Sequence, residues 1–367
     1  MNPINNTKYY TILSETKKIN EEKNKSENEH EYKKRTNHKY IKNPNFKSYS
    51  DIIKTNYPYG GNDSFEIYTS YKDNKLYIAS PRDNSNYLDI FSLIDNKRII
   101  SLKHQRDIQG VKYFFNKKNN NEYLVASNYD VIYIRDISNN YKLMYEINIL
   151  HGNCLLIFLE NNNDYIVASS KMHSFSIDES TRIYSFSNCS LVRYIDNTKH
   201  EQIEYLIYWY NQKDNKNYFI QLAHGKILIN NLLENELYAE LVNNEYSFHS
   251  TGFIYNKNNI DYLGVSANDG SDNGLIEIWD LYNKNLFKVF KGVGSNITCV
   301  MRWNYKYFLI CDWKNKCLKI FDLENEKVIS NIKEKNCIRC VKKVYHPIYG
   351  ESLLTSDEKN KIKLWVI

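Results

Sequence analysis

The sequence predicts an all-β protein built from seven copies of one four-stranded unit. Three observations support this: a short motif recurs seven times, another strand precedes each copy, and helical periodicity is lacking. The motif reads aliphatic, any residue, aliphatic, aromatic, polar, and its clearest copy is "IEIWDL" at Ile276 to Leu281. Its fourth residue falls at positions 91, 135, 186, 230, 279, 321 and 365, a period of about 45 residues.

The other six copies show the same alternation, which is typical of a strand with two different faces. They are "LDIFSL" (Leu88 to Leu93), "IYIRDI" (Ile132 to Ile137), "IYSFSN" (Ile183 to Asn188), "ILINNL" (Ile227 to Leu232), "LKIFDL" (Leu318 to Leu323) and "IKLWVI" (Ile362 to Ile367).

Each copy of the motif has strand-like neighbours. The segment before it is "LYIAS", "YLVAS", "YIVAS", "YFIQL", "YLGVS", "YFLIC" or "SLLTS", and five of the seven open with Tyr. A further strand precedes that one, such as Ile108 to Asn116, and polar loops rich in Asn and Lys join the two as expected for hairpins. A last strand, such as Lys327 to Ile332, follows every motif but the seventh. Four strands per unit predict a blade, and seven blades predict a β-propeller of antiparallel sheets.

These residues resemble the WD-repeat family. Trp279-Asp280 matches the dipeptide of that family, and Phe321-Asp322 and Arg135-Asp136 keep half of it. The resemblance runs from about residue 50 to the end, but the repeats are divergent: Gly-His is missing at the blade starts, and Asn230-Asn231 replaces the dipeptide. Membership would imply a seven-bladed propeller that acts as an interaction scaffold.

The seventh unit, which begins at Cys337, supplies only three strands before the chain ends at Ile367. The segment "SDIIKTNYP" (Ser50 to Pro58) has no unit of its own and is predicted to be the missing strand. In propellers of the resembled family an N-terminal segment closes the ring in this way, which removes an exposed sheet edge. We therefore expect a polar, disordered tail at 1–45 and a propeller at 46–367.

Charge argues against a general nucleic-acid binder. Residues 1–45 carry nine Lys, one Arg and six Glu, so the remaining 39 Lys+Arg and 37 Asp+Glu leave the propeller nearly neutral. The sequence shows neither an apolar stretch of spanning length nor the apolar core of a signal peptide. We expect a soluble cytoplasmic protein without membrane insertion, with "KKR" at Lys33 to Arg35 as an alternative nuclear address.

Catalytic and metal-binding patterns are weak. Seven cysteines fit a reducing compartment, and the one close pair, Cys337 and Cys340, should point to opposite faces of a strand. The histidines are dispersed over different blades, and "KGVGSN" (Lys291 to Asn296) reads as a turn without the helix that a phosphate-binding loop needs. The sequence therefore predicts no catalytic residue, no metal and no cofactor.

Two functions remain. The favoured one is a non-catalytic scaffold, a monomeric propeller within a larger complex, which binds a protein or peptide through loops on one face. The alternative is an enzyme or small-ligand binder that uses the central channel, against which the apolar and aromatic inner strands argue.

The candidate binding residues lie in the connections between blades and the loops between second and third strands. They are Arg106, Tyr129 and Trp313, chosen because interfaces favour aromatic and arginine side chains. For Trp313 an equal alternative is packing onto the adjacent blade.

Overall fold

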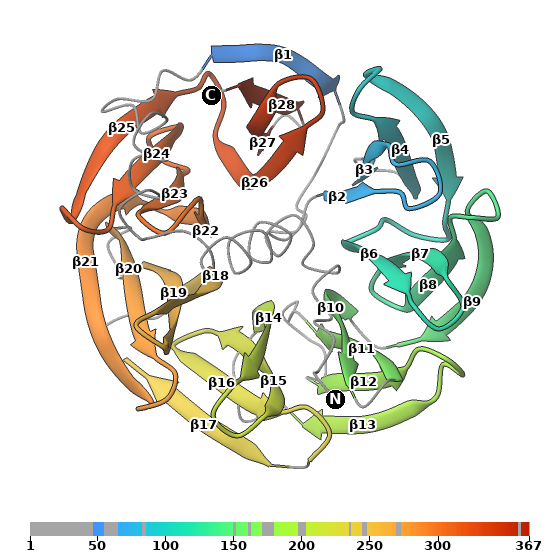
Figure 1. Cartoon of the computed structure of the whole chain (residues 1–367), viewed down its shortest axis with the longest axis horizontal. Helices are drawn as coiled ribbons and strands as arrows, with labels where there is room; N and C mark the ends of the chain where they lie inside the picture. The colour runs from blue at the N-terminus through green and yellow to red at the C-terminus, as the bar shows by residue number, and fades with distance from the viewer. Residues whose placement is uncertain are drawn as a thin grey trace, which may run out of the picture.

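The computed structural model describes residues 47–54, 65–82, 86–149, 152–160, 163–170, 180–196, 203–234, 236–243, 248–268, 273–358 and 361–366. Within these ranges the strands form seven antiparallel four-stranded sheets, arranged as a ring of blades (Figure 1). The predicted seven-bladed β-propeller is confirmed. The described ranges contain no helix, and so no helix that could cross a membrane. The predicted tail at 1–45 lies outside the described residues.

Each blade runs from an inner to an outer strand, and the blades are numbered here in chain order. Blade 1 consists of β2 (Glu66–Thr69), β3 (Leu76–Pro81), β4 (Tyr87–Ser92) and β5 (Lys97–Lys103). Blade 2 consists of β6 (Gly110–Asn116), β7 (Asn121–Ser127), β8 (Val131–Asp136) and β9 (Lys142–Asn148). Blade 3 consists of β10 (Gly152–Glu160), β11 (Asn163–Ser170), β12 (Ser180–Ser185) and β13 (Leu191–Asp196). Blade 4 consists of β14 (Ile203–Asn211), β15 (Lys216–Ala223), β16 (Lys226–Asn231) and β17 (Leu237–Val242). Blade 5 consists of β18 (Phe248–Lys257), β19 (Ile260–Asn268), β20 (Asn273–Asp280) and β21 (Asn285–Ser295). Blade 6 consists of β22 (Ile297–Arg302), β23 (Tyr307–Asp312), β24 (Cys317–Asp322) and β25 (Lys327–Lys333). Blade 7 consists of β26 (Ile338–His346), β27 (Gly350–Asp357), β28 (Lys361–Val366) and β1 (Lys47–Lys54).

The ring is closed by β1, the N-terminal strand. It pairs antiparallel with β28, with Lys47 opposite Val366 and Lys54 opposite Lys361, and Figure 1 shows it on the outside of the C-terminal blade. The predicted closure is therefore correct, but the closing strand begins before Ser50 and ends at Lys54. Residues 55–58 of the predicted strand lie outside the described ranges.

The core lies between neighbouring blades. In blade 2 nearly all of β7 and β8 is buried, whereas β9 is exposed except for Ile147. One apolar cluster joins blades 6, 7 and 1 and includes Phe65, Leu309 and Leu354, so the ring is also sealed by packing.

Asparagine makes the hairpin turns possible. Asn74, Asn120, Asn215 and Asn258 all adopt positive φ in the turns between first and second strands. Asparagine tolerates this left-handed conformation better than most residues, because its short polar side chain can bond locally. The Asn-rich loops of the sequence thus suit the turn geometry.

Two details of the predicted repeat are wrong. In blade 3 the backbone N–H of Phe186 bonds to the carbonyl of Asp164, as the N–H of Ile137 does to Glu122, so the motif there is "TRIYSF", shifted by two residues. Aromatic Tyr184 and Phe186 both fit the pattern, and only pairing decides between them. The stretch 291–295 is also no turn, because it continues the long outer strand β21, with Gly292 at φ +69°.

Candidate functional site

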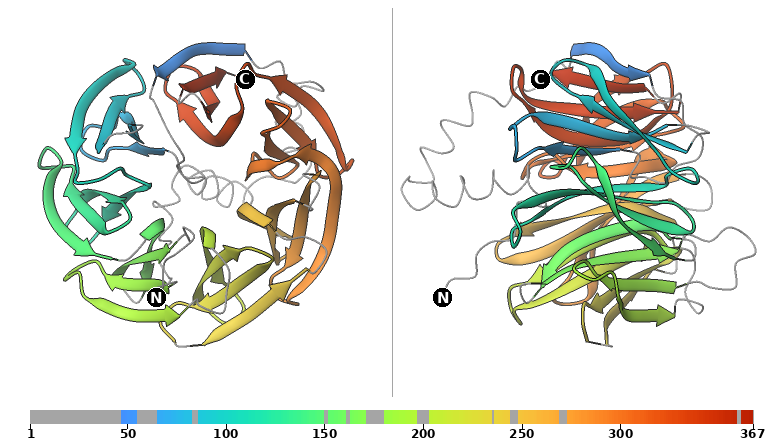
Figure 2. Two further views of the ribbon diagram at one scale, coloured as in Figure 1. Left: turned by 180° about the vertical axis from the view of Figure 1, so that it is seen from behind. Right: turned by 90° about the vertical axis from the view of Figure 1, so that its right-hand side faces the viewer.

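The antiparallel blades give the disc two rims, visible edge-on in Figure 2. We call the upper rim the face that carries the loops between second and third strands and the connections between blades. The lower rim carries the turns between first and second and between third and fourth strands. All three predicted residues belong to the upper rim.

Arg106 and Tyr129 lie in one sector of the upper rim, on blade 2 and its connection from blade 1. The guanidinium of Arg106 forms an ion pair of 2.6 Å with Asp130, which follows Tyr129 in the loop between β7 and β8. The loop is fixed from beneath by Asn128, a fully buried residue whose Oδ1 accepts the N–H groups of Asp130 and Val131 at 2.8 and 2.7 Å. Tyr129 is half-buried. The loop of this sector is thus held by buried hydrogen bonds, and the guanidinium of Arg106 has an acidic partner.

His104 is buried at the start of the connection that bears Arg106. Its Nε2 accepts a hydrogen bond of 3.3 Å from Nε of Arg135, and its ring packs edge-on against Tyr133. Burial, with a smaller effect of Arg135, lowers the pKa of His104 to about 3. His104 is therefore a neutral structural acceptor at ordinary pH.

Trp313 lies in a second sector, on the loop between β23 and β24 of blade 6. Asp312, at the base of this loop, is fully buried, pairs with Lys319 at 2.7 Å and accepts the N–H and amide of Asn315 at 3.0 and 2.9 Å. The N–H of Trp313 also bonds to the carbonyl of Asn296. The loop is thereby held on two sides.

The ring of Trp313 contacts the next blade. It is half-buried, and the guanidinium of Arg339, at the start of β26, lies 5.6 Å from its centroid. Such a cation–π contact is worth about 0.5–1 kcal/mol at an exposed site. Trp313 thus combines the two predicted alternatives, since it packs against blade 7 and still presents part of its surface.

The structure does not bring the three predicted residues together. Arg106 and Tyr129 are neighbours, whereas Trp313 lies on blade 6, with blades 7 and 1 between the two sectors. Sequence reasoning missed Arg339, because it belongs to an inner strand and reaches Trp313 only across a blade junction.

At the lower rim, carboxylates join neighbouring blades. Asp261 of blade 5 accepts Nε1–H of Trp209 at 3.1 Å and the hydroxyl of Tyr282 at 2.8 Å, and Glu351 of blade 7 accepts Nε1–H of Trp303 at 2.5 Å. In both cases the tryptophan comes from the preceding blade, so the bond ties two blades together.

Blade 2 has a carboxylate at the corresponding position of its second strand. Glu122, which is 1% exposed, accepts the hydroxyls of Ser70 and Tyr113 at 3.0 and 2.8 Å and the N–H of Tyr71 at 2.5 Å. Each of these carboxylates is the second residue of the second strand of its blade, in "NEY", "IDY" and "GES". For Glu122 and Asp261, an acidic residue before the recurrent Tyr is the signal that could have predicted them.

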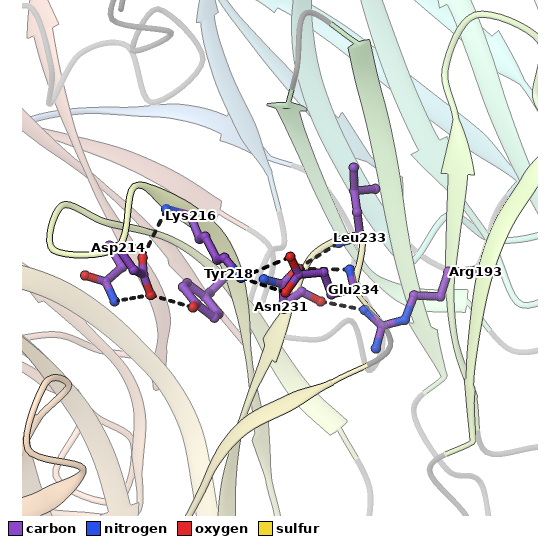
Figure 3. Close-up of polar contacts among 8 residues, drawn as sticks. Arg193, Asp214, Lys216, Tyr218, Asn231, Leu233 and Glu234 are labelled. Carbon is purple, nitrogen blue, oxygen red and sulfur yellow. Dashed lines mark hydrogen bonds and ion pairs between the residues drawn. The ribbon is translucent and has the colours of Figure 1, made fainter.

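Both turns of blade 4 are also locked at the lower rim (Figure 3). Nζ of Lys216 bonds to both carboxylate oxygens of Glu234 at 3.0 and 2.8 Å, joining the two turns. Oδ1 of Asn231 accepts the N–H of Leu233 and of Glu234 at 3.1 and 3.0 Å, and Arg193 of blade 3 reaches its carbonyl at 2.5 Å. Asn231 thus performs in the divergent repeat the turn-capping that Asp280 performs in blade 5.

Two cations of the inner strands contact a neighbouring blade. Lys342 of β26 pairs with Glu66 of β2 at 3.1 Å, and the guanidinium of Arg302 lies over the ring of Tyr255. Among the described residues no group of His, Cys, Asp and Glu side chains could hold a metal ion, and Cys337 and Cys340 are buried free thiols.

Comparison with known proteins shows similar folds but assigns no family. No family model matches the chain, and no curated protein matches it. Solved structures that it resembles include two crystal structures of BBS1N in complex with ARL6DN, one soaked with mercury and one with lead. Each has a TM-score of 0.62 at 9% sequence identity and covers 88% of this chain and 95% of that chain. At this identity the likeness shows the propeller fold alone.

Proposed function

We propose that this protein is a non-catalytic scaffold, a divergent WD-repeat-like propeller that binds a protein or peptide partner through its upper rim. The observation that carries the proposal is that the loops bearing Tyr129 and Trp313 are fixed at their bases by buried Asn128 and Asp312, and that Arg106 pairs with Asp130 of the Tyr129 loop. A loop ordered before binding loses little conformational freedom on association, which favours affinity.

Two further points support the proposal. The inner-strand cations Lys342 and Arg302 are engaged with Glu66 and Tyr255, as expected for a channel that serves packing. BBS1N, which shares the fold, is a propeller in complex with another protein. We further propose that the protein is cytoplasmic and works as one member of a larger complex.

The test is affinity purification of the full chain from its native cells, followed by mass spectrometry. Arg106→Ala, Tyr129→Ala and Trp313→Ala should each be compared with Tyr345→Ala, which removes an aromatic side chain, 67% exposed, from the end of β26 at the lower rim. Partners that the unaltered protein recovers should be lost with at least one upper-rim variant and retained with Tyr345→Ala. Recovery of every partner by all three upper-rim variants, or loss with Tyr345→Ala alone, would overturn the proposal.

A further inference from the structure

The junction of blades 6 and 7 gathers lysines on the upper rim. Lys314 and Lys316 belong to the Trp313 loop, and Lys333 and Lys335 lie at the end of β25 and in the connection that follows it. All four side chains are exposed. Together with Trp313 and Arg339 these residues form what we call the basic platform.

The carboxylates of the same junction are buried or paired. Asp312 is fully buried against Lys319, and both oxygens of Glu334 bind Nζ of Lys363 at 2.9 and 2.6 Å. Asp357 accepts the side-chain amide of Asn336 at 2.7 Å and the N–H of Lys361 at 3.0 Å. Glu358, half-buried in the loop after β27, lies against Cys337. Lys319 and Lys363 pair with Asp312 and Glu334, so the five cations of the platform stand against the carboxyls of Asp357 and Glu358, and positive charge is in excess.

The platform is also rigid. Besides the contacts of Asp312, the carbonyl of Lys316 accepts the N–H of Glu334 at 2.8 Å, which ties the Trp313 loop to the connection bearing Lys335. The backbone that carries the cations is therefore held in place around a partly exposed indole ring. This geometry suits a ligand that carries several negative charges beside an apolar group.

Several cations elsewhere on the described surface pair with a carboxylate. At the lower rim Lys216 pairs with Glu234, Lys306 with Glu324, and Lys343 with Glu351. On the upper rim of blade 2, Arg106 is neutralised by Asp130. The cations of the basic platform gather at one blade junction, which fits a peptide better than a nucleic acid, whose binding demands a broad basic face.

We propose that the basic platform binds a segment of a partner protein rich in aspartate and glutamate, with an apolar residue of that segment against Trp313. This inference rests on the proposed scaffold function and names the chemistry of its partner. Carboxylates would bond to Arg339 and the four lysines, and the long-range attraction would weaken as salt screens it.

The experiment uses the full chain and a fluorescein-labelled twelve-residue peptide of glutamate, aspartate and leucine, measured by fluorescence anisotropy. Its neutral partner peptide has glutamine and asparagine at the same positions. The double variant Lys333→Glu/Lys335→Glu is matched by Lys327→Glu/Lys97→Glu, which changes equal charge at the lower rim, with Lys327 at the opposite end of the same strand as Lys333.

We expect the acidic peptide to bind at least tenfold more tightly than the neutral one. Lys333→Glu/Lys335→Glu and Trp313→Ala should each weaken binding at least tenfold, the control variant should bind within twofold of the unaltered chain, and added salt should weaken binding.

Several results would overturn the inference. They are equal binding of the two peptides, equal loss with the control variant, and tighter binding of a single-stranded oligonucleotide of the same charge. A tenfold gain on deletion of residues 1–44 would also overturn it, because the chain's own tail would then be the occupant. If the peptide fails while Trp313→Ala still loses cellular partners, the scaffold function stands and only the acidic chemistry is wrong.

Discussion

The two rims of this propeller use their charged residues differently. At the lower rim, carboxylates such as Asp261, Glu122 and Glu351 receive indole, hydroxyl and backbone donors from the preceding blade. At the upper rim of blades 6 and 7, Asp312 is buried beneath its loop and Glu334 pairs with Lys363, while lysines are exposed at the surface. The bonds of the lower rim thus tie neighbouring blades together, whereas the exposed cations of the upper rim are the surface that the proposed function uses.

The closing strand spans both rims and gives the largest expected effect. Deletion of residues 1–54 removes β1 and exposes the edge of β28, so we expect aggregation or a melting temperature lower by more than 10 °C. Deletion of 1–44 alone leaves β1 intact and should melt like the full chain. Indistinguishable melts of the two truncations would show that β1 does not stabilise the ring.

The effects of replacing two tryptophans, one in the core and one on the upper rim, can be compared. Trp279 is 3% exposed and its Nε1–H donates to Glu277 at 2.8 Å. We expect Trp279→Ala to cost about 3–5 kcal/mol, because it opens a cavity and removes one of the donors of a buried carboxylate. Trp313→Ala should cost about 1 kcal/mol, since it removes a half-buried ring and a surface cation–π contact. Denaturant unfolding measures both, and equal losses would place Trp313 in the core.

Carboxylates of the two rims can be compared directly. Asp261→Asn should cost about 2 kcal/mol, because an amide cannot accept all the donors of Trp209, Tyr282 and Asn256. Asp130→Asn, which breaks only the exposed pair with Arg106, should cost about 0.5 kcal/mol or less. A reversed order in denaturant unfolding would contradict a structural lower rim.

A pH-dependent effect is expected at Glu160, at the lower-rim end of β10. Burial raises its pKa to about 7, with Glu234 adding to the shift and a bond from Asn217 opposing it. The folded state keeps a proton that the unfolded state releases, so stability falls as pH rises from about 4.5 to about 7.

Glu160→Gln should therefore stabilise the protein by about 1 kcal/mol at pH 8 and by nothing at pH 4. Thermal melts across this range measure the difference, with the exposed Glu146→Gln as control. A difference that does not vary with pH would remove burial of Glu160 as its cause.

Much of the fold could be predicted from particular residues. The alternating motif around Trp279 and its six relatives predicted the third strand of each blade. The missing outer strand of the last unit predicted closure by the N-terminal segment. Register failed at "IYSFSN", because an alternating strand reads the same when shifted by two residues. Only the hydrogen bond of Phe186 to Asp164 decided it.

The candidate site was less predictable. Topology correctly placed Arg106, Tyr129 and Trp313 on one rim, since the order of antiparallel strands fixes which loops share a face. Whether they form a site is a separate prediction that purification must test. The separation of Trp313 from the other two, and its contact with Arg339, depend on which blades adjoin around the ring.

The sequence by itself determined the repeat, the number of blades and the turn chemistry, because strand alternation and asparagine at positive φ are local properties of the chain. The tertiary structure alone decided which charged side chains are buried in ion pairs and which are exposed at the surface. Asp312 and Lys335 look alike in sequence, as charged residues near loops. One is buried against Lys319 and the other is exposed, and only the packing of blade on blade sets that difference.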